Sequence, residues 1–549
     1  MKKHILLAAV ICSFFIACNS KQNSNGQSEG SDDTSAKNEK KITKRDYSIN
    51  AYNAYNDIFL DSAAVENFIS KNKVADSVLR RMRSFYNARN YQFAWFSSKG
   101  LTEQALGFWN LYNYAAFTET DAPKDPALKK VMENLMADTD YSVKASDKNM
   151  VNTELSLTSH LIVYTLSNYE KGFVKRKEME HFVPIKKEDA MVLADSLLTK
   201  KHKDNKYFDD VNNAYKQLKE QLKIYYDIQK NGGWPQIAGD AKQYKKGKSS
   251  PMIATLKKRL QITGDMPVGD SGQVFDDSLQ NGIKLFQQRL GYNQNGVITT
   301  GLIKDLNVTA SQRVEQLYIN LNRMRWMPQE PDGKLILVNL PEFVLHFVDG
   351  KNKVFDMDVV VGKEGHNTVL FTGKLSTIVF SPYWNVPTSI VKKEIVPHMA
   401  SNANYIEQQN MEITGYNGSL PVVRQKPGEK NSLGRVKFLF PNSFDIYFHD
   451  TPAKSLFSQD KRAYSHGCIR LSDPVKMAQY LLKDNSSWPP DKIEEAMNQD
   501  HETYVTVKDP IPVFITYYTA WVDENGMLNF RDDIYSRDAD VAAKMYSGK

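Results

Sequence analysis

The chain has 549 residues, and 71 Lys and Arg against 64 Asp and Glu leave a formal net charge of +7 at pH 7. Hydrophobic residues make up 41%, which is globular composition, and at about 150 residues per domain the length predicts three or four domains. The only cysteines, Cys12, Cys18 and Cys468, exclude a disulfide scaffold and any four-cysteine zinc or iron–sulfur site. Because basic and acidic residues are nearly balanced, we expect no nucleic-acid partner.

The first 17 residues have the pattern of a secretory signal peptide. Lys2 and Lys3 precede an apolar run that is too short to cross a bilayer, which takes about 20 residues. The run ends in Phe15-Ile16-Ala17-Cys18, which resembles a bacterial lipobox, where cleavage leaves a cysteine to be lipidated. We predict a signal peptide over 1–17 and a lipoprotein anchored through Cys18 to the inner or outer membrane, on its periplasmic face. The alternative is an ordinary signal peptide with an incidental cysteine.

Two segments of different composition follow. Residues 18–46 are rich in Ser, Asn, Gln, Gly and Lys and have too little apolar surface to offset chain entropy, which predicts a disordered tether. From 47 to 250, apolar residues recur with helical spacing, as in Val65, Phe68 and Ile69, which predicts an α-helical scaffold domain. Four aromatic residues there could line a glycan groove, although their spacing favours a core: Trp95, Phe108, Trp109 and Tyr112.

A smaller module is predicted over 251–310. It starts with a helix that carries Ile253, Leu256 and Leu260, continues with a second helix around Phe286-Gln287, and closes with a turn and a third helix that ends at Leu306. This order resembles the small three-helix peptidoglycan-binding module. A helical spacer without a ligand is the alternative.

From Lys334 the apolar period changes to two, which indicates strands. We predict them over 335–340, 343–348, 354–361, 376–380, 436–440 and 444–448. Together they suggest a mixed β-sheet or small barrel within 311–510, with a lid-like insertion over 388–430 and a last segment of strands and tail over 511–549. The predicted fold class is therefore multidomain α+β.

The third cysteine lies in a segment suited to covalent catalysis. A free thiol is mostly protonated at neutral pH, so a cysteine nucleophile needs a base. His449 ends a predicted strand and is the better candidate, whereas His466, two residues before Cys468, is better placed to shape the loop. Gly467 permits an unusual backbone whose amides suit an oxyanion hole. The helix predicted after Asp473 would mildly favour a thiolate through its dipole.

Cys468 has three other possible roles. The residue could be an inert buried thiol. It could bind a metal with His449 and His466, but three ligand-type residues without a fourth cysteine make a poor metal site. A papain-like peptidase normally has its cysteine early and its histidine late, and here the order is reversed.

The segment His449-Asp450-Thr451, followed by Ser465-His466-Gly467-Cys468-Ile469-Arg470, resembles the signature of the L,D-transpeptidases with a YkuD-type catalytic domain. The similarity extends to Trp326-Met327-Pro328 and to Phe530-Arg531-Asp532, which look like the large multidomain YcbB-like branch.

The resemblance implies an enzyme that crosslinks peptidoglycan. Cys468 would attack a tetrapeptide stem of the meso-diaminopimelate type, with His449 as base, and a carbapenem would acylate Cys468. An oxyanion hole and its loop would comprise Tyr447, Gly467, His466 and Ser465. Supporting roles would fall to Arg470, Asp450 and Trp384, and Asp450 would act through its carboxylate or its carbonyl. No metal or other cofactor is implied. The rival functions are an L,D-carboxypeptidase or endopeptidase and a non-enzymatic peptidoglycan-binding anchor.

Overall fold

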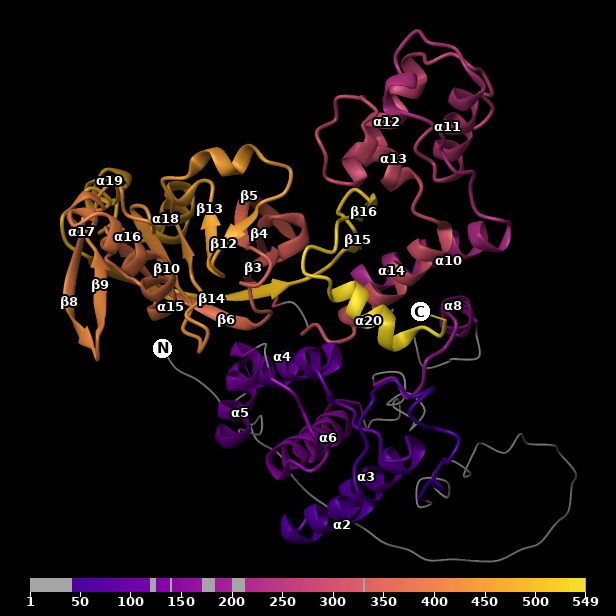
Figure 1. Ribbon diagram of the computed structural model, residues 1–549, viewed down its shortest axis with the longest axis horizontal. Coiled ribbons are helices and arrows are strands. Elements are labelled where there is room, and N and C mark those ends of the chain that lie inside the picture. The colour runs from indigo at the N-terminus through magenta and orange to yellow at the C-terminus, as the bar shows by residue number, and fades with distance from the viewer. Residues whose placement is uncertain are drawn as a thin grey trace, which may run out of the picture. The chain divides into compact units, whose positions relative to one another are not determined.

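The computed structural model describes residues 42–118, 125–138, 141–169, 183–199, 213–328 and 331–548, and Figure 1 shows their helices and strands. The predicted signal peptide, Cys18 and most of the predicted tether lie outside these residues. The end of that tether is bound to a helix, because Thr43 N–H donates to Ser84 Oγ (3.1 Å) and Asp46 N–H donates to the Asn87 carbonyl (2.9 Å). The predicted disorder up to residue 46 is therefore wrong for these last residues.

The N-terminal helical region has its own apolar core. Asp61 caps the first helix by accepting a hydrogen bond from Ala63 N–H, and the predicted stripe of Val65, Phe68 and Ile69 is buried. A short hairpin of β1 (Phe96–Ser97) and β2 (Gly100–Leu101) interrupts the helices. The helices are α2 (Ser62–Lys71), α3 (Asp76–Ala88), α4 (Glu103–Thr118), α5 (Pro126–Ala137) and α6 (Lys148–Tyr169).

The aromatic residues of this region form core and not a groove. Trp95 and Phe108 are fully buried, and Trp109 and Tyr112 expose 3% and 5% of their surface. Trp326 from a later helical segment packs edge-on against Trp95, with ring centroids 6.4 Å apart. The prediction of core over glycan groove is confirmed.

A second core joins helices from four of the predicted segments. Its helices are α8 (Ala190–Leu198), α10 (Asn213–Lys230), α11 (Pro251–Ile262), α12 (Asp277–Arg289), α13 (Thr300–Leu306), α14 (Ala310–Met324) and α20 (Arg537–Met545). The apolar stripe of α10, which includes Leu218 and Leu222, packs in this core and not in that of α2 to α6. The predicted scaffold (47–250) is thus divided between two cores, because residues after 190 bury their apolar faces with α14.

The segment predicted as a small module contains α11, α12 and α13. Ile253, Leu256 and Leu260 are fully buried, as the helical spacing predicts. The Gln287 side chain holds the turn that follows α12: it accepts from Gly296 N–H at 2.8 Å and donates to the Val297 carbonyl at 3.1 Å.

The β-rich region is built on one sheet that closes on itself. Within the described residues its strand order is β12-β5-β13-β11-β10-β6-β14-β3-β4, and β4 also pairs with β5. Three neighbouring pairs are parallel (β11–β13, β12–β5 and β14–β3) and the others are antiparallel, so the predicted mixed, barrel-like sheet is observed. The strands are β3 (Lys334–Asn339), β4 (Val344–Asp349), β5 (Asn352–Gly362), β6 (Thr372–Phe380), β10 (Val436–Leu439), β11 (Phe448–His449), β12 (Ala463–Ser465), β13 (Ile469–Leu471) and β14 (Thr503–Thr516).

Two predicted boundaries in this region are wrong. The strand expected over 444–448 is only β11, because Asn442 and the left-handed Asp445 (φ 52°) form a turn before it. The boundary expected at 510/511 falls inside β14, which pairs with both β6 and β3. Residues 511–516 therefore belong to the central sheet.

The insertion has a small apolar core of its own. Its strands β8 (Met411–Asn417) and β9 (Leu420–Gln425) form a sheet with β7 (Trp384–Asn385), and its helical part comprises α15 (Thr388–Ile390), the π-helix η4 (Val391–Ile395), α16 (Val396–Ser401) and α17 (Tyr405–Gln408). Outside the insertion lie α18 (Pro474–Leu482), α19 (Pro490–Ala496), and the short helices η2 (Ala241–Gln243), η3 (Leu340–Glu342) and η5 (Lys454–Ser458).

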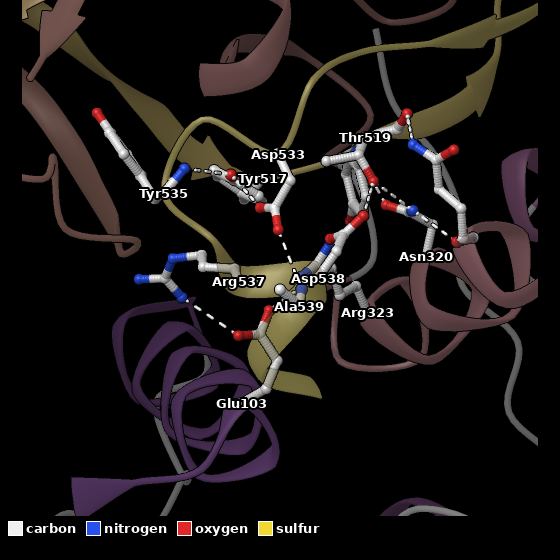
Figure 2. A network of polar contacts seen from close by, with 12 residues as sticks. Glu103, Asn320, Arg323, Tyr517, Thr519, Asp533, Tyr535, Arg537, Asp538 and Ala539 are labelled. Atoms are coloured by element: carbon white, nitrogen blue, oxygen red, sulfur yellow. Dashed lines mark hydrogen bonds and ion pairs between the residues drawn. The ribbon is translucent and has the colours of Figure 1, made fainter. Parts of the chain in front are cut away.

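The C-terminal segment contains the expected strands, β15 (Ala520–Val522) and β16 (Leu528–Phe530), but it ends in a helix, α20 (Arg537–Met545), that the sequence analysis missed. A buried ion-pair network joins this helix to α4 and α14 (Figure 2). Arg323 of α14 lies 2.7 Å from Glu103 of α4 and 2.5 Å from Asp538 of α20. The tail is thus anchored by buried charges.

Candidate active site

Parallel pairing of two short strands places the segments that carry Cys468 and His449 side by side. In β11 and β13, Phe448 is opposite Ile469 and His449 is opposite Arg470, so Cys468 lies just before the strand beside His449. Ile469 N–H donates to the Tyr447 carbonyl at 3.2 Å. Phe448 and Ile469 are fully buried, and their packing fixes this register.

The His449 imidazole is buried and neutral. Its Nδ1 lies 2.5 Å from the carbonyl oxygen of Asp450, which assigns a proton to Nδ1, and the Leu433 backbone is a second hydrogen-bond partner of the ring. Burial, together with the positive charge of Arg470, lowers the pKa of His449 to about 3. The imidazole is therefore uncharged at neutral pH.

Asp450 orients His449 with its backbone and not with its carboxylate. The carboxylate instead binds Lys454 Nζ at 2.6 Å and Arg435 N–H at 2.9 Å. The sequence left open whether Asp450 acts through its carbonyl or its carboxylate. In the structure the carbonyl contacts the imidazole, and the carboxylate binds neighbouring residues of the chain.

Cys468 is half-buried and protonated. Its Sγ lies 3.4 Å from the Asp445 carbonyl, the acceptor for the thiol proton. Burial raises the pKa of Cys468 to about 11, although hydrogen bonds from the Tyr447 backbone and side chain and the charge of Arg470 act in the opposite direction. The mild effect predicted for the dipole of the helix after Asp473 therefore does not decide the charge of the thiol, because desolvation outweighs nearby positive charge.

The loop before Cys468 is shaped by Ser465 and Gly467. Gly467 has φ +117°, which a residue with a side chain rarely adopts. Ser465 Oγ accepts a hydrogen bond from Gly467 N–H at 3.2 Å and donates one to the Cys468 carbonyl at 2.5 Å. The two predicted loop residues thus act together on the backbone around the thiol.

The His466 side chain contacts the insertion. It is exposed, and its Nε2 lies 3.0 Å from Glu394 Oε1 in η4. Its ring also packs edge-on against His366, with centroids 5.0 Å apart. His466 therefore connects the nucleophile loop to the insertion.

The supporting residues differ in their surroundings. Arg470 is half-buried, and its Nε is enclosed without a hydrogen-bond partner among the residues that the structure describes. Trp384 lies on β7, pairs with Gln425 of β9 and packs against the core of the insertion. Arg470 thus carries an available positive charge beside the thiol, whereas Trp384 belongs structurally to the insertion.

Comparison with known proteins finds sequence similarity in two parts of the chain. Residues 333–513 match the model of the L,D-transpeptidase catalytic domain (YkuD), and residues 80–222 match a scaffold domain. Residues 333–513 are therefore similar to L,D-transpeptidase catalytic domains. A Haemophilus influenzae protein provisionally named an L,D-transpeptidase is 30% identical over 254 residues, which cover 43% of this chain and 50% of the relative. The match thus spans only half the length of that relative.

Solved L,D-transpeptidases are similar at low identity. A structure from Stackebrandtia nassauensis is 16% identical and covers 52% of this chain and 98% of its own, with a TM-score of 0.21. One from Xylanimonas cellulosilytica is 15% identical and covers 51% and 98%, with a TM-score of 0.16. Scores this low support no residue-by-residue correspondence.

The region that matches the catalytic-domain model also contains contacts that no local sequence pattern indicated. Thr368 donates to the Gly467 carbonyl across 99 positions of sequence, and Glu394 meets His466 across 72. Neither residue has a neighbouring motif that could have indicated its partner. Across the described ranges there is no group of three His, Cys, Asp or Glu side chains suited to a metal, and no helix long and apolar enough to cross a membrane.

Proposed function

We propose that this chain is a peptidoglycan L,D-transpeptidase that forms 3–3 crosslinks through a thioester on Cys468. The main support is the pairing of β11 with β13, which brings a neutral His449 beside the strand that follows Cys468. A thiol with a pKa of about 11 needs a base during attack, and the neutral imidazole of His449 is the proposed base. The matched catalytic domain supports the substrate class.

In the first half-reaction, the Cys468 sulfur attacks the carbonyl carbon of the third residue of a tetrapeptide stem while His449 takes the thiol proton. A C–S bond forms, the C–N bond to the terminal D-alanine breaks, and His449 returns the proton to the leaving amine. In the second half-reaction, an amine of a neighbouring stem attacks the thioester. A C–N bond forms, the C–S bond breaks, and the proton lost by the amine returns to sulfur through His449.

Charge develops on the carbonyl oxygen in both half-reactions. The Tyr447 hydroxyl and the backbone N–H group of Cys468 are the proposed donors, since preorganised donors at such an oxygen stabilise the transition state. The Arg470 guanidinium, whose Nε has no partner within the described chain, is proposed to meet a carboxylate of a meso-diaminopimelate stem. Trp384 and the insertion would line the acyl-donor cleft, and a carbapenem would acylate the same sulfur.

The location of the enzyme forms part of the proposal. A lipid on Cys18 would hold it on the periplasmic face of the envelope, with residues 19–42 as a tether. The three-helix segment would keep the catalytic domain on peptidoglycan.

The decisive experiment incubates the protein with purified disaccharide tetrapeptide and identifies the products by mass spectrometry. We expect 3–3 crosslinked dimers and free D-alanine. Tripeptide without dimers would instead indicate an L,D-carboxypeptidase, and unchanged substrate would support a non-enzymatic anchor. Cys468→Ala and His449→Ala are the matched inactive controls, and either one forming dimers at the wild-type rate would contradict the mechanism.

A further inference from the structure

Three of the four backbone polar groups of Gly467 and Cys468 have hydrogen-bond partners. Gly467 N–H and the Cys468 carbonyl both bind Ser465 Oγ, and the Gly467 carbonyl binds Thr368. Among the described residues, the Cys468 N–H has no acceptor. Hydrogen bonds therefore fix the backbone of the loop, and the one backbone donor of these two residues without a partner in the described chain is the N–H of Cys468 itself.

Thr368 sets the direction of that free donor. The residue is fully buried between β5 and β6. Its Oγ1 accepts from Gly362 N–H at 3.0 Å and uses its single proton on the Gly467 carbonyl at 2.9 Å. The carbonyl and N–H of a trans peptide point in opposite directions, so holding the Gly467 carbonyl also aims the Cys468 N–H away from Thr368.

Thr368 is itself braced from outside the matched catalytic domain. The Tyr535 hydroxyl accepts from Thr368 N–H at 3.4 Å and donates to the Gly362 carbonyl at 2.6 Å. Tyr535 N–H in turn donates to the Tyr517 hydroxyl at 2.9 Å, at the edge of the buried network shown in Figure 2. Gly362 leaves little freedom here, because a Cβ on it would lie 2.1 Å from the His366 carbonyl oxygen.

We propose that Thr368, braced by Tyr535, is a positioning residue that turns the Cys468 N–H toward the carbonyl oxygen of the bound acyl donor. This inference rests on the proposed function. It makes the orientation of one oxyanion-hole donor depend on a hydroxyl that is far from the thiol in sequence, and it makes the C-terminal segment a necessary support of the nucleophile loop.

The test compares three single substitutions in the full chain. Thr368→Val keeps the shape of the side chain and removes its hydroxyl, whereas Thr368→Ser keeps the hydroxyl. Thr372→Val is the matched control, because Thr372 is also buried and its Oγ1 has no hydrogen-bond partner within the described residues. Acylation by meropenem is followed by intact-protein mass spectrometry over a range of concentrations, which separates the first-order acylation rate constant from the half-saturating concentration.

We expect Thr368→Val to lower the first-order acylation rate constant at least tenfold, since losing one oxyanion donor costs about 10²–10³ and a displaced donor costs part of that. The half-saturating concentration should change less than threefold. Thr368→Ser should acylate within threefold of wild type, and Thr372→Val within twofold. A Thr368→Val rate equal to that of Thr372→Val, or no rescue by serine, would overturn the role of Thr368.

A second variant covers the case in which Thr368→Val does not fold. Tyr535→Phe removes only the hydroxyl that braces Thr368 and should slow acylation three- to tenfold at an unchanged half-saturating concentration; a wild-type rate constant would overturn the inference. The wild type itself tests the proposed function. If meropenem does not acylate it, the proposed function fails and the role of Thr368 loses its premise, whereas a reactive wild type with unaffected variants overturns the inference alone.

Discussion

The Cys468 thiol should stay protonated through neutral pH, in contrast to the thiolate–imidazolium pairs of some cysteine enzymes. Burial raises the pKa of Cys468 to about 11 and lowers that of His449 to about 3. At about pH 7.5 roughly one thiol in 3,000 would then be ionised, against about one in eleven for an exposed cysteine. Alkylation by iodoacetamide, which requires the thiolate and needs no help from a base, should therefore be about 300-fold slower than for a free cysteine peptide.

The assay measures alkylation of the peptide that contains Cys468 by mass spectrometry between about pH 6 and pH 10, with a free cysteine peptide in the same tube as reference. The rate should rise about tenfold per pH unit without a plateau. Arg470→Gln should slow alkylation further, because the positive charge of Arg470 lowers the pKa of Cys468. A rate that is constant from about pH 5 to pH 8 would reveal a thiolate–imidazolium pair and refute the reasoning.

Three further predictions concern the loop, the base and the buried network. Gly467→Ala should abolish acylation although space surrounds the residue, because φ +117° is unfavourable for alanine; wild-type acylation kinetics would contradict this. The pKa of His449 lies below its ordinary value of 6.5, so its contribution to stability is complete above about pH 6.5 and is lost as the pH falls toward 3. Between about pH 8 and pH 5, wild type should thus lose about 2 kcal/mol more unfolding free energy than His449→Gln, as measured by urea titration, and equal losses would exclude a buried neutral imidazole. Arg323→Met leaves Glu103 and Asp538 buried without their shared counter-charge and should cost about 3–5 kcal/mol in the same titration; a cost below about 1 kcal/mol would show that the network is dispensable.

Local sequence patterns predicted many of the helices and strands, because these elements depend on residues that are close together in the chain. The 3.6-residue period located α2 through Val65, Phe68 and Ile69, and Asp473 was expected to open the helix that became α18. Alternation of apolar residues located β3 to β6 within a few residues of their ends. The spacing of His449 and Cys468 indicated a nucleophile and its base before any fold was known.

Local sequence thus accounts for the chemical groups of the site and the elements that carry them: a cysteine, a histidine at a strand end, a glycine loop and the periodic strands and helices around them. The environment of these groups comes from tertiary packing. That packing tied Nδ1 of His449 to a carbonyl instead of a carboxylate, protonated Cys468 by burial, and brought Thr368 to the loop from 99 residues away. The pKa of a side chain and its hydrogen-bond partners depend on which groups are buried around it. Segments that are distant in sequence bury one another only when the chain packs, so local sequence does not contain this information.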